Sequence, residues 1–246
     1  MMLAFLYHRV GSGKYANPPE LLERHLAFLA SRANIVLPGE PLPPFSLNVC
    51  LTFDDATYDF YHYAYPLLKK YGLRALLAVP VHYILEETEL DPAIRLSIPY
   101  SAAMKGDIFQ THAPFCTWAE LKEMAQSGHV AIASHSVHHQ HLLTPGLDLD
   151  LEIVGSKRML EEKLQTSVRT FVYPLGKFNR RIHRQVKNHY EFAMRIGTAW
   201  NWSWQNLSKM TYRVISDNLK EIDEQLRLKR WLSFSWFHFV NSLRMR

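Results

Sequence analysis

Short apolar runs alternate with amphipathic segments along most of the chain. The runs that predict strands are 3–7, 47–53, 74–79, 130–134, 170–173, 192–196 and 212–215. The segments with helical spacing are 21–29, 58–71, 118–128, 151–164 and 180–188. Because strand and helix alternate, the pattern predicts an α/β domain with a mainly parallel sheet or barrel.

One segment breaks this alternation. Residues 84–116 show no clear period and contain three prolines and a glycine, which is long for a loop inside a compact domain. We expect a functional or partly helical insertion that shapes a substrate groove. Thr117 and Glu120 directly after it have the spacing of a capping box, which predicts a helix start there.

The composition is that of an ordinary globular domain. The 246 residues are 48% hydrophobic and 21% charged, which excludes disulfide scaffolds, collagen-like chains and disordered chains. The net charge is +5, from 28 Lys and Arg against 23 Asp and Glu, which is too small to indicate a nucleic acid partner. The 13 histidines favour metal or acid–base chemistry without locating it.

The N-terminal residues and the cysteines bear on location. No basic segment precedes the first apolar run, so we expect no signal peptide and a cytoplasmic protein. No run approaches the roughly 18 apolar residues of a membrane span. Cys50 and Cys116 are expected to be free thiols.

Residues 217–246 form a separate C-terminal part that is basic and aromatic. Read as a helix, this part places an apolar set on one side: Leu228, Leu232, Trp236, Phe239 and Leu243. Such a helix either packs on the domain or lies in a membrane interface. In the second case, residues 226–246 would hold the protein peripherally at the inner face of the membrane. The sequence gives no oligomeric state.

Polar residues follow several of the predicted strands directly. Asp54 and Asp55 end one strand, His135 follows another and Tyr173 ends a third. In a parallel barrel the carboxyl ends of the strands share one rim, so these residues would meet there. The two adjacent carboxylates should point in different directions, so one could bind a cation while the other acts as a base. The alternative is that one of them caps the following helix.

Four histidines lie within seven residues after the strand at 130–134. His135 and His139 are four apart, so on a helical turn both imidazoles would face one side. Two imidazoles and a carboxylate form a three-ligand site of the kind found with catalytic zinc or a similar divalent ion. His138 and His141 are the rival ligands.

Three motifs together resemble those of the polysaccharide deacetylase superfamily, carbohydrate esterase family 4. The motifs are Thr52-Phe53-Asp54-Asp55, His135-Ser136-Val137-His138-His139 and Tyr173-Pro174-Leu175-Gly176. The resemblance covers roughly residues 3–216. It implies a distorted (β/α) barrel of the deacetylase type with fewer than eight units, a catalytic domain over residues 1–216, and one divalent metal, usually zinc.

The resemblance also implies an activity and residue roles. The activity is removal of an N-acyl group, most often acetyl, from an amino sugar in a glycan or lipid-linked saccharide, as in bacterial cell-envelope glycans. Asp55, His135 and His139 would bind the metal, and Asp54 would be the general base. The oxyanion and the substrate would meet the segment Tyr173-Pro174-Leu175, with the N–H of Leu175 facing the oxyanion.

The sequence departs from the family pattern at several positions. Ala56 stands where the family usually has glycine, a costly change if positive φ is required. No late strand carries the histidine that protonates the leaving amine. His238 is the late candidate for this acid, and His8 could reach the same rim. Arg213 is a candidate charge partner for Asp54.

Two other functions stay open at this point. The missing acid would fit a catalytically impaired glycan-binding protein on the same fold. A site rich in Asp and His would also fit a metal-dependent phosphoesterase, which would need further carboxylates at the rim.

Overall fold

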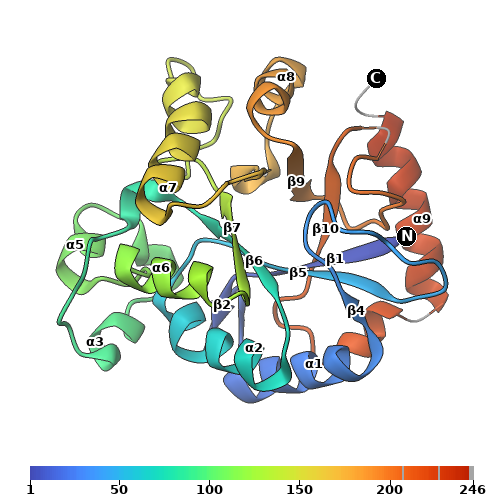
Figure 1. Ribbon diagram of the computed structural model, residues 1–246, viewed down its shortest axis with the longest axis horizontal. Coiled ribbons are helices and arrows are strands. Elements are labelled where there is room, and N and C mark those ends of the chain that lie inside the picture. The colour runs from blue at the N-terminus through green and yellow to red at the C-terminus, as the bar shows by residue number, and fades with distance from the viewer. Residues whose placement is uncertain (207, 227, 244–246) are drawn as a thin grey trace.

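Seven parallel strands close into a barrel (Figure 1). The computed structural model describes residues 1–206, 208–226 and 228–243. In barrel order the strands are β1 (Met2–Tyr7), β5 (Asn48–Phe53), β6 (Ala75–Val79), β7 (Val130–Ser134), β8 (Thr170–Val172), β9 (Phe192–Ile196) and β10 (Thr211–Ile215). Since β1 pairs with both β5 and β10, the sheet has no gap there. A distorted (β/α) barrel with fewer than eight units is therefore confirmed.

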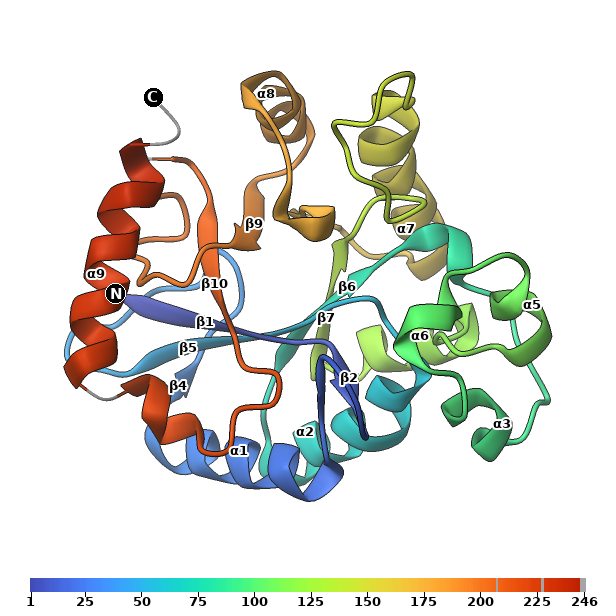
Figure 2. The same ribbon diagram turned by 180° about the vertical axis from the view of Figure 1, so that it is seen from behind.

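Shorter strands and the helices lie outside the barrel. Strand β4 (Asn34–Ile35) pairs with the start of β5, and β2 (Arg9–Val10) pairs with β3 (Ala16–Asn17). The longer helices are α1 (Pro19–Arg32), α2 (Tyr65–Tyr71), α6 (Trp118–Gln126), α7 (Ser156–Leu164), α8 (Arg180–His189) and α9 (Leu228–Leu243). Figure 2 shows these helices around the strands from behind. The predicted capping box is confirmed, because Thr117 and Glu120 each bond the backbone of the other.

Alternate residues of each strand fill two separate apolar layers. Small and medium side chains such as Ala4, Cys50 and Ala78 fill the barrel interior. Larger ones such as Phe5 and Leu51 pack between the strands and the helices. Cys50 and Cys116 are both buried free thiols, as the sequence predicts.

The insertion predicted over residues 84–116 is partly helical. It contains three short helices: α3 (Pro92–Leu96), α4 (Tyr100–Ala103) and α5 (Ile108–His112). The buried guanidinium of Arg95 holds it together by donating to the carbonyl oxygens of Ala113 (2.9 Å) and Phe115 (2.8 Å) and to Glu120 (2.7 Å). Because Glu120 also caps α6, the insertion is tied to the start of that helix.

Among its described side chains, helix α9 packs on the domain through one face. Phe234 is fully buried, and the Asn241 amide donates to the carbonyl oxygen of Gly197 at 2.8 Å. Leu232, Trp236 and Phe239 on the other face are each more than half exposed. In the part of the chain that the structure describes, no helix is long and apolar enough to cross a membrane.

Candidate metal and acid–base site

The carboxyl ends of the strands bring the motif residues together, as the barrel topology requires. Asp54 and Asp55 follow β5 and are 3% and 0% exposed. The Asp54 N–H donates to the carbonyl oxygen of Tyr7 at 2.9 Å, which continues the β1–β5 pairing into the site. The chain then turns sharply, with φ of 73° at Asp55 and 49° at Ala56.

Asp55, His135 and His139 form a compact group of potential metal ligands. One ligand atom from each lies within 4.8 Å of the others. The Asp55 Oδ1 atom is 3.4 Å from His139 Nε2 and 3.7 Å from His135 Nε2. Both Asp55 oxygens are buried without a hydrogen-bond partner among the described residues. A bare buried carboxylate is costly, so this group fits a divalent cation.

The other nitrogen of His135 determines how its ring faces the group. His135 Nδ1 lies 2.8 Å from the carbonyl oxygen of Val172, which can only accept a hydrogen bond, so Nδ1 carries the proton. The lone pair of Nε2 therefore faces Asp55, as a metal ligand requires. Burial, partly offset by Asp54, lowers the pKa of His135 to about 4, so the ring is neutral at ordinary pH.

The loop that carries His139 is not the helical turn that its spacing suggests. Ser136 and His139 have φ of 64° and 52°, and the Ser136 hydroxyl accepts the His139 N–H at 3.1 Å. The imidazoles of His135 and His139 converge because Ser136 and His139 have left-handed backbone. His138 turns away, with its Nδ1 2.6 Å from Glu152 Oε1. His141 Nδ1 accepts the N–H of Leu143, and His141 is outside the ligand group.

Asp54 is held by Arg213, the partner suggested by the sequence. The buried guanidinium makes two hydrogen bonds to the carboxylate, from Nη1 to Oδ1 (2.6 Å) and from Nη2 to Oδ2 (2.9 Å). Burial alone would raise the pKa of Asp54, but the charge of Arg213, with His135 and His8 behind it, holds that pKa well below its usual range. Asp54 is therefore a carboxylate at neutral pH, oriented by a bidentate pair.

His8 lies at the same rim and pairs with Asp217. Its Nδ1 is 2.6 Å from Asp217 Oδ2, and its backbone N–H donates to Oδ1 at 3.0 Å. Burial disfavours the charged ring, but the hydrogen bond to Asp217 and the charges of Asp54 and Asp55 outweigh it and raise the pKa of His8 to about 9. Sequence reasoning missed Asp217, although it follows the strand that ends at Ile215 and so meets the same rim.

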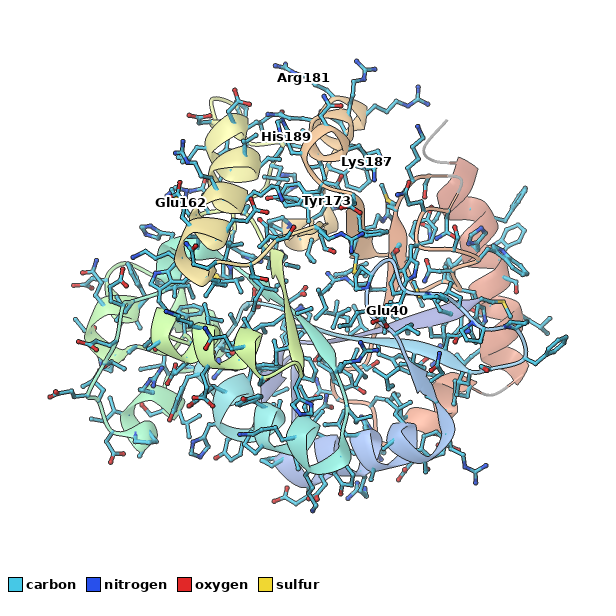
Figure 3. The ribbon with its side chains drawn as sticks, viewed as in Figure 1. Glu40, Glu162, Tyr173, Arg181, Lys187 and His189 are labelled. Atoms are coloured by element: carbon cyan, nitrogen blue, oxygen red, sulfur yellow. The ribbon has the colours of Figure 1, made fainter. Side chains whose placement is uncertain are left out.

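The remaining predicted site residues are Tyr173, Pro174, Leu175 and His238. The Tyr173 hydroxyl is buried 2.6 Å from His183 Nδ1, at the base of the helix that carries Arg181 and Lys187 in Figure 3. Pro174 is buried, and Leu175 is 54% exposed with φ of 56°. The structure does not bring His238 to the site, because its Nδ1 bonds the carbonyl oxygen of Trp200 and its ring meets Tyr212 on the outer layer.

A pocket of about 520 Å³ is lined by residues 9–15 and 96–101. The rings of Tyr15 and Tyr100 in this lining lie 5.6 Å and 6.4 Å from the ring of His8. Tyr100 comes from the insertion, and its pKa is raised by burial and by the charge of Asp55. The insertion therefore forms one wall of a pocket that adjoins the rim.

The chain was compared with known proteins. The sequence model of the family described as "Polysaccharide deacetylase" matches residues 46–194. YxkH of Bacillus subtilis (strain 168), a protein named as a polysaccharide deacetylase, is 28% identical over 186 residues, which are 71% of this chain and 56% of YxkH. The chain thus spans just over half the length of this curated relative.

Solved structures show the same fold. A polysaccharide deacetylase from Bacillus cereus, BC0361, superposes with a TM-score of 0.73 at 17% identity, over 92% of this chain and 67% of its own. Streptococcus pyogenes deacetylase PplD, solved with acetate, gives 0.71 at 20% identity over 92% and 96%. IcaB from Ammonifex degensii gives 0.71 at 20% identity over 94% and 96%. By its family match over more than half its length, the chain belongs to the polysaccharide deacetylase family.

Proposed function

We propose that the protein is a metal-dependent N-deacetylase that releases acetate from an N-acetylated amino sugar in a glycan. The observation that carries this proposal is the juxtaposition of two kinds of carboxylate at one rim. The Asp55 carboxylate lies against two imidazoles and accepts no hydrogen bond from the described residues, while the neighbouring Asp54 is kept ionised by Arg213. A hydrolase needs both a cation site and a base beside it.

Asp55, His135 and His139 would hold the ion. Two imidazoles and one carboxylate are the donor set of catalytic zinc sites, so zinc is the metal we expect. When bound, a divalent ion there polarises an acyl carbonyl and lowers the pKa of a water molecule. His135 contributes through a ring fixed by Val172, which limits the reorganisation needed on binding.

Asp54 acts as the general base. Its carboxylate stays ionised because the positive charge and two hydrogen bonds of Arg213 stabilise it. Asp54 Oδ2 is 3.7 Å from His135 Nε2, so the base lies directly beside the ligand group. Asp54 takes a proton from the water whose oxygen adds to the acyl carbon.

His8 supplies the proton for the leaving amine. With a pKa of about 9, the ring is protonated at neutral pH, and Asp217 fixes its orientation. When the carbon–nitrogen bond breaks, the sugar nitrogen takes the His8 proton and leaves as a free amine, while the acyl group leaves as acetate. The backbone N–H of Leu175 is the proposed donor to the developing oxyanion.

The test is acetate release from a panel of N-acetylated oligosaccharides. Asp54→Asn should lower turnover by about 10²–10⁴-fold, since it removes the base. The bound metal, measured by elemental analysis, should stay at the wild-type ratio because Asp54 is not among the ligands. Asp107→Asn, an exposed aspartate in the insertion, is the matched control. Undiminished acetate release by Asp54→Asn would contradict the proposal.

Neither alternative gains support from the site. Among the described residues, one group of His and carboxylates fits a single ion, whereas a two-metal phosphoesterase needs further ligands. In this proposal His8, which directly follows β1, takes the role of the acid for which the late part of the sequence offers no strand histidine.

A further inference from the structure

Exposed large apolar side chains are concentrated in one region of the molecule. Among the described residues, six such side chains are more than half exposed. Leu175 belongs to the active-site rim. The other five are Phe45 (107%), Trp202 (64%), Leu232 (69%), Trp236 (62%) and Phe239 (55%). We call these five residues the α9 surface.

Hydrogen bonds connect the three segments that carry the α9 surface. Asn48, three residues after Phe45, donates to the carbonyl oxygen of Met1 at 3.1 Å. Asn201, next to Trp202, pairs with Met2. His238 of α9 bonds the carbonyl oxygen of Trp200 at 2.9 Å. The segments therefore meet at the start of β1, where Figures 1 and 2 both show α9 beside the N-terminus.

Helix α9 presents two different faces. Its inner face packs through Phe234, whose ring centroid is 6.1 Å from that of Trp200. Its outer face carries Leu232, Trp236 and Phe239 at helical spacing, and the last two rings lie 6.1 Å apart. Trp and Phe on an unpartnered helix face are the residues that favour the bilayer interface.

The charge of this region favours an anionic bilayer over a second copy of the chain as the binding partner of the α9 surface. The sequence over residues 226–246 contains five Lys and Arg and no Asp or Glu. Of these five, Arg230 is the one whose side chain is described, and it is exposed. In a symmetric dimer through α9, each copy would bring this same basic segment against its own image, and the like charges would repel. An anionic bilayer supplies the opposite charge over a wide area and accepts aromatic side chains.

We propose that the α9 surface binds the interface of an anionic lipid bilayer and holds the protein there peripherally. This role is independent of the proposed catalytic activity. Apolar insertion of the exposed aromatic side chains supplies part of the binding free energy, and the basic segment supplies the part that salt weakens.

Sedimentation of the full chain with vesicles tests the proposal. We expect binding to phosphatidylcholine vesicles containing phosphatidylglycerol, weaker binding to pure phosphatidylcholine, and release at high salt. The double variant Trp236→Glu/Phe239→Glu should bind at least about tenfold more weakly, because it removes two inserting rings and adds negative charge. Ile94→Glu is the matched control, since Ile94 is an exposed apolar residue on α3.

Three outcomes would overturn the proposal. The first is equal binding of the double variant and the wild type. The second is equal binding to both vesicle types at low salt. The third is a dimer in analytical ultracentrifugation that Trp236→Glu dissociates, together with no vesicle binding, which would assign the surface to a second copy. Unchanged melting temperatures of both variants serve as the folding control, because the substituted side chains are exposed.

Discussion

The pairing of His8 with Asp217 controls the pH at which the proposed acid holds its proton. Asp217→Asn removes the negative charge of the hydrogen-bond partner that raises the pKa of His8. The pKa should then fall from about 9 toward the ordinary histidine value of about 6.5. The basic limb of the rate profile for acetate release should move to lower pH, by an amount similar to the fall in the pKa of His8. A limb that stays in place in Asp217→Asn would remove His8 from the acid role.

The same pair makes stability depend on pH, with a definite sign. Because the folded pKa of His8 is raised, the pair stabilises the fold fully below the unfolded pKa of about 6.5 and loses this contribution as pH rises through about 9. Asp217→Asn should therefore lower the free energy of unfolding in urea by on the order of 2 kcal/mol at pH 6. The cost should shrink as the pH approaches 10, and a pH-independent cost would contradict this assignment.

Left-handed backbone at individual residues is the feature that was hardest to predict from the sequence. Asp55, Ala56, Ser136, His139 and Leu175 all have φ between 49° and 73°. Each such residue costs roughly 1–2 kcal/mol relative to right-handed backbone. Ala56 shows the problem well: the sequence shows that glycine is missing, but only the structure shows that positive φ is required there. Strained residues at a site are expected where geometry outweighs local preference.

At the scale of elements, the insertion over residues 84–116 depends on Arg95. Its guanidinium donates to the segment of Ala113 and Phe115 and to Glu120, and its central carbon lies 3.5 Å from the centroid of the Tyr58 ring. Arg95→Ala would leave buried carbonyl groups and Glu120 without their partner, at a cost of about 3–5 kcal/mol. Arg95→Lys should rescue little, because an ammonium cannot reproduce the planar fork.

Limited proteolysis measures this effect locally. We expect faster cleavage within residues 84–116 in Arg95→Ala. Lys105→Ala, at an exposed position of the same insertion, is the control and should be cleaved like the wild type. A cleavage pattern identical to that of the wild type would show that the insertion is held by other contacts.

The alternation of elements was predictable, whereas several pairings were not. Periodicity predicts the barrel strands, and the rim rule predicts that Asp54, Asp55 and His135 meet. The His8–Asp217 pair depends on β1 lying beside β10, a contact between the first and last strands of the barrel that no local pattern encodes. Helix α9 was predictable as an amphipathic helix, but the face that packs carries Phe234 and Asn241, whereas Leu232, Trp236 and Phe239 of the predicted apolar set are exposed. The side chains of Leu228 and Leu243 lie outside the described residues.

At the scale of the whole molecule, metal binding should be visible in stability as well as in activity. A ligand that binds only the native state stabilises it by about 2.7 kcal/mol at 100 times its Kd. Removing the metal with a chelator should therefore lower the melting temperature, and restoring zinc should raise it again. In Asp55→Ala the difference should vanish, since the unpaired buried carboxylate is gone. Equal melting temperatures with and without chelator in the wild type would contradict a bound ion.

The direction of β1 determines how high the site would stand above a bilayer. β1 begins beside α9 and runs away from it for six residues toward the rim, a rise of roughly 20 Å (Figure 1). A protein resting on its α9 surface would thus hold the proposed catalytic centre above the bilayer by at least this rise, which is about two-thirds of a hydrocarbon-core thickness. A sugar attached directly to a lipid headgroup would lie beneath the enzyme. The units within reach would be those farther out on a long glycan chain, whether or not its end is anchored in the same membrane.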